Sequence, residues 1–217
     1  MTRVHTEPGP LASSWARMIG KRVTLFPDEV AEGVRQGDPD AVGAVYVALA
    51  DRLLGYLVAR VHDRATAEDL LEVTFIELLQ NGRTINGGPA AIKVWLFRSA
   101  YFNAMDHLRR VKRRAEDLYE YPADLEVHDD DRGPEDWAMA SETGRQMRSA
   151  MESLSDDQRH VLLLRYVGGL SAPEAATVLG KSDGAVRSLQ HRGEKSLARM
   201  LDHIRPAPSR SSGASSA

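Results

Sequence analysis

The chain contains no cysteine among its 217 residues. This absence excludes disulfide bonds, thiolate metal sites and a redox switch built on thiols. The sequence also has no apolar run as long as a bilayer-spanning helix, and its first residues lack the continuous apolar segment of a secretory signal. We therefore expect a cytoplasmic protein that does not insert into a membrane.

The chain also has no excess of positive charge, and its net charge is −3. The charges are nevertheless segregated along the chain. The basic stretch HLRRVKRRAE starts at His107, and the acidic stretch AEDLYEYPADLEVHDDDRGPED follows it directly. Nucleic-acid binding depends on the local potential rather than on the charge of the whole chain, so this composition is compatible with a basic DNA-binding surface.

Strand-like alternation is absent too, and helical periodicity dominates the sequence. Apolar residues at three- and four-residue steps predict a first long helix with the face Val42, Val45, Leu49, Leu53 and Tyr56. A second helix is expected through TAEDLLEVTFIELLQNG, capped by Thr66 and ended by NG, with the face Leu71, Phe75 and Leu78. Pro89 suits the first turn of a third helix, which runs into the basic stretch.

The second half of the chain carries clear helix starts. Helical periodicity resumes at Trp137, beyond the acidic stretch. Ser155 is followed three residues later by Gln158, and Ser171 by Glu174, as in a capping box. In that motif the two side chains reciprocally satisfy free backbone amides, so each serine predicts the start of a helix.

These patterns predict an all-α fold of two small helical domains joined by a flexible acidic linker. The expected organisation is a flexible N-terminal extension (1–26), a first helical domain (27–114), the linker (115–136), a second helical domain (137–203) and a disordered tail (204–217).

The stretch LSAPEAATVLGKSDGAVRSLQHRGEKSL predicts a helix-turn-helix. Ser171 caps a helix of about two turns, Gly180 ends it, and Ser182 caps the next helix after a short turn. Two helices joined so tightly cross steeply. The second is expected to turn polar side chains outward, namely Arg187, Ser188, Gln190, His191, Arg192 and Lys195. Such groups can reach base edges in the major groove, although an ordinary helical hairpin with a solvated face gives the same spacing.

Two parts of the sequence resemble the domains of one known family. ESLSDDQRHVLLLRYVGGLSAPEAATVLGKSDGAVRSLQHRGEKSL resembles region 4, the C-terminal promoter-binding domain of bacterial sigma factors. GDPDAVGAVYVALADRLLGYLVARVHDRATAEDLLEVTFIELL, followed by VWLFRSAYFNAMDHLRR, resembles sigma region 2. With only these two domains and a short linker, residues 28–201 resemble the extracytoplasmic-function (ECF) subfamily of the sigma-70 family.

The chain departs from the family pattern at a few positions. Glu72 and Val73 stand where the family often has Gln-Glu, Leu189 and Gln190 stand where it often has Arg-Leu, and Gly193 replaces an alanine. A leucine at position 189 still completes the apolar face of its helix. The departures therefore bear on single polymerase contacts and on promoter preference, and leave the expected fold unchanged.

The resemblance implies a protein that catalyses nothing, gives core RNA polymerase its promoter specificity and helps to open the DNA. It assigns polymerase docking to the second helix, through Asp69, Leu70, Glu72, Phe75 and Ile76. It assigns −10 recognition and melting to the third helix, through Arg98, Asn103, Arg109, Arg110 and Arg113. It assigns −35 recognition to the helix-turn-helix, through Lys181, Ser182, Arg187, Ser188, His191 and Arg192.

The third helix interleaves aromatic and basic residues, which suits the stacking of unpaired bases and the binding of phosphates. Lys93 is one of its candidate phosphate ligands, and Asn103 is the candidate for a polar contact with a flipped base. Trp95 and Phe102 are at core spacing, so we expect both to pack inside the protein. The HDDD run at 128–131 lies in the predicted linker without a rigid frame, so we expect no metal and no cofactor.

Parts of the sequence are also compatible with other classes of protein. The main alternative is a stand-alone helix-turn-helix regulator, although no dimer interface or ligand pocket is visible in the sequence. A second is an adaptor that binds polymerase alone. A third alternative is a nucleic-acid enzyme, but the sequence has no Walker loop, metal-spaced cluster or nucleophile motif to support it. For a sigma factor the expected partners are core RNA polymerase, promoter DNA and an anti-sigma factor, and the free chain is expected to be a monomer.

Overall fold

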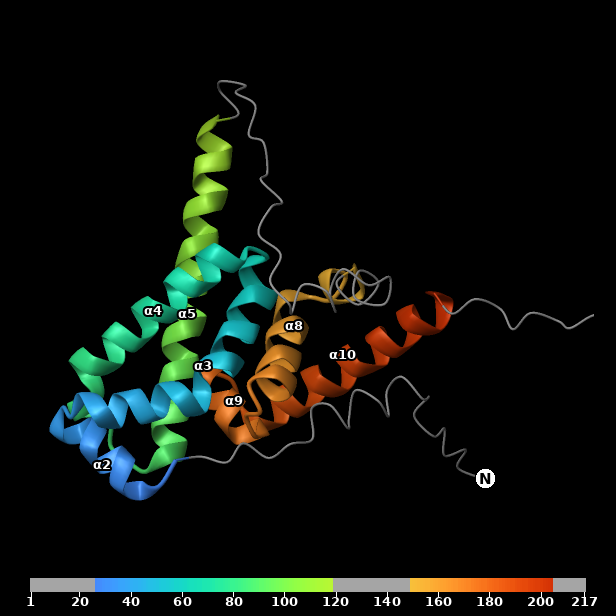
Figure 1. The fold of residues 1–217 in the computed structure, drawn as a ribbon. Coiled ribbons are helices and arrows are strands. Elements are labelled where there is room, and N and C mark those ends of the chain that lie inside the picture. Colours follow the sequence, from blue (N-terminus) through green and yellow to red (C-terminus); the bar gives the residue numbers. More distant parts are fainter. Residues whose placement is uncertain (1–25, 119–148, 205–217) are drawn as a thin grey trace, which may run out of the picture.

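The computed structural model describes residues 26–118 and 149–204, and in these two ranges it contains helices and no strand (Figure 1). The N-terminal part consists of α2 (Asp28–Gln36), α3 (Pro39–Val61), α4 (Arg64–Asn81), η1 (Gly82–Thr84) and α5 (Pro89–Leu118). The C-terminal part consists of α8 (Asp156–Leu162), η2 (Leu163–Val167), α9 (Ala172–Leu179) and α10 (Asp183–Ile204). The all-α prediction is confirmed. The predicted N-terminal extension, most of the linker, the helix start at Trp137 and the tail lie outside the described residues.

Two helices of the N-terminal part, α3 and α4, begin at acidic caps. Asp38 accepts a hydrogen bond from the Asp40 amide at the start of α3 (3.0 Å). Asp63 accepts one from the Thr66 amide at the start of α4 (2.8 Å). The prediction that Thr66 itself caps this helix is therefore wrong: Asp63 has the extended backbone of a cap, and Thr66 already lies within the first turn. Pro89 opens α5 as predicted.

The apolar faces predicted for α3 and α4 are confirmed as core. Their buried residues include Val42, Val45, Leu49, Leu53, Tyr56, Leu71, Phe75 and Leu78. The expectation that the sequence has no apolar run as long as a bilayer-spanning helix is wrong, because α3 has the length and mean hydropathy (1.5) of a membrane span. Among the described helices α3 packs against α2, α4 and α5, and 44% of the apolar stretch is buried. The protein core therefore accounts for the apolar composition of α3.

The signals predicted for the C-terminal part are confirmed. Ser155 and Ser171 each form a complete capping box at the start of α8 and α9. Gly180 has a φ of 62° and ends α9, and the Ser182 hydroxyl accepts a hydrogen bond from the Ala185 amide at the start of α10 (3.2 Å). This left-handed backbone conformation favours glycine, because a Cβ atom there is sterically unfavourable. Helices α9 and α10 thus form the predicted helix-turn-helix.

The two parts of the chain are packed against each other. Helix α9 lies on α5, and η2 lies on α3 (Figure 1). The buried apolar residues of both parts form one continuous cluster, which extends from Phe26 to Leu189. Direct contacts therefore hold the two parts together in this structure.

Candidate functional site

The exposed face of the helix-turn-helix carries most of the predicted −35 residues. Ser182, Arg187, Ser188, His191 and Arg192 are exposed. The Arg187 guanidinium lies beside the Asp183 carboxylate, with 2.8 Å between Nη2 and Oδ2, and its side chain is 68% exposed. This pair is one helical turn apart and lies in solvent, where such contacts contribute little stability, so Arg187 can exchange Asp183 for another partner.

Lys181 lies at the edge of this face. Its ammonium contacts the Asp157 carboxylate of α8 at 2.9 Å, and the lysine side chain is 29% exposed. Lys181 therefore differs from the freely exposed residues of this face, because its ammonium already forms an ion pair with a carboxylate of α8. A role for Lys181 in DNA binding stays a prediction.

A polar network holds α10 in place on η2. The Arg165 Nε donates to the Gln190 side-chain oxygen (3.0 Å), and the Gln190 amide donates to the Tyr166 hydroxyl (3.2 Å) and to Glu194 (2.8 Å). The Tyr166 hydroxyl also bonds to Glu194, and burial, together with that carboxylate, raises the pKa of Tyr166 to about 12. The prediction that Gln190 points outward is wrong, because this network holds its amide inside.

The predicted −10 residues lie along α5. Arg98, Arg109, Arg110 and Arg113 are exposed, and Arg109 is paired with Asp106 (3.0 Å). Asn103 is half-buried, and its amide donates to Glu77, Thr74 and Ser99 at 3.3–3.4 Å. Contact between Asn103 and a base stays a prediction that would require the amide to exchange these partners.

The aromatic residues of α5 are arranged differently from the sequence expectation. Phe97 is fully buried, whereas Phe102 is 47% exposed and Trp95 is half-buried. The expectation that Phe102 packs in the core is wrong. Its ring lies against Tyr101 and under the Arg98 guanidinium, whose Cζ is 5.7 Å from the ring centre. An exposed ring beside a cation is suited to stacking with an unpaired base.

Lys93 does not lie on this exposed face. It is 5% exposed, and its ammonium contacts the Glu174 carboxylate of α9 at 2.8 Å. The expectation that Lys93 is a freely available phosphate ligand is therefore wrong for this arrangement. The reason is the packing of α9 on α5, which no local sequence pattern predicts.

An apolar groove lies between α3 and α4. Its volume is about 580 Å³, and it is lined by Tyr46, Leu54, Arg64, Glu68, Leu71, Glu72, Phe75, Ile76 and Leu79. Among the predicted docking residues the groove brings together Glu72, Phe75 and Ile76, and leaves Asp69 and Leu70 outside its lining. Phe75 is only 6% exposed and its ring packs at a tilt of 58° against the Tyr46 ring, whereas Ile76 is 43% exposed. Phe75 therefore shapes the floor of the groove and Ile76 is available at its surface.

Sequence reasoning missed part of this groove. Tyr46 and Leu79 are large apolar residues that are 48% and 49% exposed. Both are positioned next to the buried faces of their helices, so the apolar face of each helix is wider than the core requires. That excess width is the available signal, since exposed apolar surface gathered in one place indicates a binding surface.

Comparisons with known proteins identify the family. The family model "Sigma-70 region 2" matches residues 45–114, and the model "Sigma-70, region 4" matches residues 144–197. The chain is 42% identical over 194 residues to the ECF RNA polymerase sigma factor SigD of Mycobacterium tuberculosis (strain ATCC 25618 / H37Rv), covering 86% of each chain. It is 32% identical to the ECF sigma factor BldN of Streptomyces coelicolor, covering 80% of this chain and 65% of BldN. The chain belongs to the ECF sigma factors of the sigma-70 family.

Solved structures agree with the fold. CnrH, solved in complex with the cytosolic domain of CnrY, matches with a TM-score of 0.60 and 22% identity, over 82% of this chain and 98% of CnrH. RpoE of Bartonella quintana, solved with the anti-sigma factor NepR, matches with a TM-score of 0.53 and 19% identity, over 82% of this chain and 94% of RpoE. The helical architecture described above is therefore that of known sigma factors.

Proposed function

We propose that this chain binds core RNA polymerase and directs it to promoters by reading a −10 element with α5 and a −35 element with α10. The observation that carries the proposal is that one chain presents three separate surfaces: an exposed helix-turn-helix face, an aromatic and basic helix face, and an apolar groove. The protein acts by binding in the cytoplasm and catalyses no reaction of its own.

The −35 element would be read by the first turns of α10. Arg187 and Ser188 lie there with exposed side chains, and the network of Arg165, Gln190 and Glu194 holds the helix at a fixed angle on η2. Arginine can pair bidentately with guanine in the major groove, and a fixed helix orientation makes that geometry selective.

The −10 element would be opened and held by α5. Phe102 offers an exposed ring for stacking, and Arg98 lies over it. Arg109, Arg110 and Arg113 continue along the same helix as exposed cations for the phosphate backbone. Unpaired bases expose their faces only after the duplex has opened, so this surface favours the melted state over the closed one.

Polymerase would dock on the groove between α3 and α4. The groove combines exposed apolar side chains (Tyr46, Ile76, Leu79) with the carboxylates of Glu68 and Glu72 at its edge. Apolar burial in the centre provides affinity, while charges at the rim fix register and orientation. Asp69 extends the acidic rim along α4, and it is exposed.

An anti-sigma factor is the further partner that we propose. RpoE of Bartonella quintana was solved with the anti-sigma factor NepR, and CnrH with the cytosolic domain of CnrY. An inhibitor of this kind would need to cover a surface that polymerase or DNA requires, and the apolar groove between α3 and α4 is a candidate for that surface.

The proposed function is tested by run-off transcription with purified core polymerase. We expect the protein to convert core polymerase, which starts at random, into an enzyme that starts at one site of a cognate promoter. The alternative function, a stand-alone helix-turn-helix regulator, predicts that core polymerase gains no promoter-specific start. The transcript start site, mapped with and without the protein, decides between the two.

Arg187 offers a sharper test of −35 recognition. Replacing Arg187 by alanine is expected to reduce binding to the −35 element by roughly 5- to 150-fold, which corresponds to about 1–3 kcal/mol for a bidentate contact, and to relax preference at one or two base positions. Arg187→Lys keeps the charge and loses the fork geometry, so it should restore affinity more than selectivity. Binding is measured against a panel of −35 sequences at two salt concentrations.

Lys195→Ala is the matched control, since Lys195 is an exposed cation two turns further along α10. It should weaken every sequence equally, as a phosphate contact does. If Arg187→Ala also weakens every sequence equally, Arg187 is only a phosphate anchor and the base-reading role is wrong.

A further inference from the structure

The apolar groove between α3 and α4 stays open after the described parts of the chain have packed together. Tyr46, Ile76 and Leu79 line it, and all three are large apolar residues with exposed side chains. Exposed apolar surface gathered in one place is typical of a site that another segment or a partner covers. The groove is therefore available as a docking surface in the free chain.

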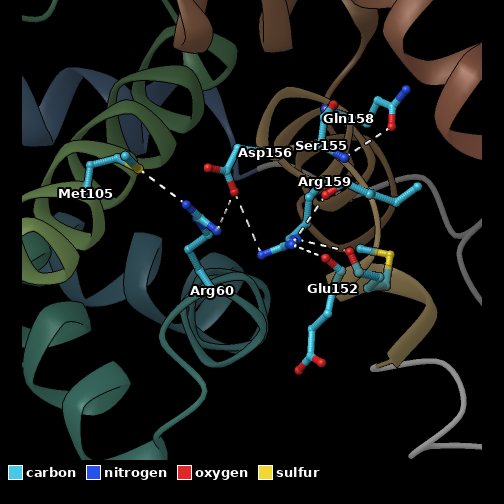
Figure 2. Close-up of polar contacts among 9 residues, drawn as sticks. Arg60, Met105, Glu152, Ser155, Asp156, Gln158 and Arg159 are labelled. Carbon is cyan, nitrogen blue, oxygen red and sulfur yellow. Dashed lines mark hydrogen bonds and ion pairs between the residues drawn. The ribbon is translucent and has the colours of Figure 1, made fainter. Parts of the chain in front are cut away.

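The side of α3 that faces the C-terminal part is already covered. Arg60, near the end of α3, is buried and contacts the Asp156 carboxylate of α8 at 3.8 Å and the Met105 sulfur of α5 at 3.5 Å (Figure 2). One turn and more before it, Arg52 donates to the Val167 carbonyl of η2 at 3.3 Å. A further segment that packs on α3 would therefore approach it from the groove side.

The sequence that precedes the described residues carries a pattern that fits such a groove. In residues 10–22, PLASSWARMIGKR, four large apolar side chains share one helical face at positions i, i+4, i+7 and i+8. They are Leu11, Trp15, Met18 and Ile19. Pro10 suits the first turn of this helix and Gly20 its end. Amphipathic helices fill apolar grooves with anchors at this spacing.

The segment and the groove also carry opposite charges. Residues 8–27 contain three basic side chains and no acidic one. The basic residues are Arg17, Lys21 and Arg22. The groove is lined by the carboxylates of Glu68 and Glu72, and its one lining cation, Arg64, is paired with Glu68 at 2.9 Å. The lining therefore keeps a net negative charge, which favours a basic segment and fixes its orientation.

The chain between this segment and the described residues is long enough to reach the groove. Phe26 is the first described residue, and α2 leads from it to Val34 over about 12 Å. Val34 lies against Gly82, because a Cβ added at Gly82 would stand 2.8 Å from the Val34 Cγ1 atom. Leu79 is one turn before Gly82, so these steps add to at most about 25 Å between Phe26 and Leu79.

The connection fixes the direction of the segment in the groove. The chain from Ile19 to Phe26 spans up to about 24 Å when extended, and packed helices lie a further 8–10 Å apart, so Ile19 can reach the Leu79 end. Leu11 is then directed toward the other end. The stretch from Leu11 to Ile19 and the stretch from Leu71 to Leu79 both rise about 12 Å, so the two helices match in length.

We propose that residues 10–19 form a helix that docks in the groove between α3 and α4 of the same chain, with Leu11, Trp15, Met18 and Ile19 as its anchors. The N-terminal segment thereby covers the surface on which polymerase docks, and polymerase must displace it. This part of residues 1–26 is then not freely flexible, in contrast to the expectation from composition. The inference rests on the proposed function only in naming polymerase as the competitor.

A single cysteine in the groove tests the docking in the full chain. The natural chain has no cysteine, so Ile76→Cys provides one thiol in the groove, and Leu79→Cys provides a second, independent probe. Trp15→Glu removes the largest anchor. We expect a thiol reagent to modify either probe roughly tenfold faster when Trp15→Glu is present, because the open groove is then the major form.

Ser13→Glu is the matched control, since Ser13 lies on the opposite face of the predicted helix and the substitution adds the same charge. It should leave the thiol as protected as in the otherwise natural chain. Val47→Cys, which is exposed on α3 outside the groove, should react at the same rate in every background. Equal rates for the groove thiols with and without Trp15→Glu would overturn the proposal. Protection that increases with protein concentration would also overturn it, because a second copy would then occupy the groove.

Binding to core polymerase gives the functional readout. Trp15→Glu should bind core polymerase roughly five- to tenfold more tightly than the wild type, because no segment has to be displaced, and Ser13→Glu should bind as the wild type does. Weaker binding of Trp15→Glu would mean that the segment contacts polymerase itself, and would overturn the proposal. If the groove thiols are protected as expected but neither the wild type nor any variant binds polymerase, the proposed function has failed and the docking of the segment stands.

Discussion

Replacing Ile76 by aspartate is expected to weaken binding to core RNA polymerase by about 100-fold or more. Ile76 lies in the groove between α3 and α4 and is 43% exposed in the free chain, so docking would bury it. An unpaired carboxylate buried in an apolar contact costs several kcal/mol, and about 3 kcal/mol corresponds to the expected loss. Fluorescence anisotropy or surface plasmon resonance with purified core polymerase measures the effect.

The matched control is Val47→Asp. Val47 is also an exposed apolar residue, on α3 beside Tyr46, but it is 86% exposed and does not line the groove. It should bind polymerase as the wild type does, and both variants should keep the wild-type unfolding temperature. Equal loss in the two variants would mean that general surface charge, rather than the groove, governs binding.

Acidification from pH 7 to pH 5 is expected to lower the free energy of unfolding by about 2 kcal/mol through His160. Burial, and then the nearby charge of Arg60, lower the pKa of His160 from 6.5 to about 4. The Asp156 backbone, followed by the carboxylates of Asp156 and Asp157, opposes this shift without reversing it. Because the folded pKa is the lower one, the unfolded chain binds the proton first. The stability is therefore complete above pH 6.5 and is lost as the pH falls toward 4.

His160→Gln should remove most of this pH dependence, because glutamine does not titrate. His191→Gln is the control, since His191 is exposed on α10, and it should leave the dependence unchanged. Urea unfolding at several pH values between 5 and 7 measures both. The prediction is wrong if the wild type and His160→Gln lose the same free energy over this range.

Local signals made the helix-turn-helix predictable from sequence. A capping box needs only a serine and an acidic or amide residue three positions later, and a left-handed stop needs only a glycine. Ser155, Ser171 and Gly180 behave as those rules require. The same reasoning placed the cap of α4 wrongly because both Asp63 and Thr66 are capping residue types, and only the backbone shows which one precedes the helix.

The aromatic pattern of α5 shows where periodicity was misread. The fully buried face of this helix runs through Ile92, Leu96, Phe97, Ala100 and Ala104. After Phe97 the buried face continues through the alanines. The prediction considered mainly large apolar residues, and it therefore placed Phe102 in the core. Counting alanine as a core residue would have turned Phe102 outward.

The contacts between the two parts could not be predicted from local patterns. Lys93 and Glu174 are far apart in sequence, and each looks like an ordinary solvated charge. The Gln190 amide likewise faces inward because Arg165, Tyr166 and Glu194 meet it there. Gly55 offers a hint, since a glycine within a helix costs stability and often marks a close approach of another segment, and a Cβ atom added there would stand 3.2 Å from the Val167 Cγ1 atom.

The most direct test of the central claim is a footprint of core polymerase and this protein on a promoter. The promoter is first identified by mapping, across the genome, where polymerase binds together with this protein. The account predicts two separate protected segments, one for each promoter element, and permanganate-reactive thymines only in the downstream segment. A single protected site, or a palindromic pair without reactive thymines, would contradict it and would identify the chain as a duplex-binding regulator.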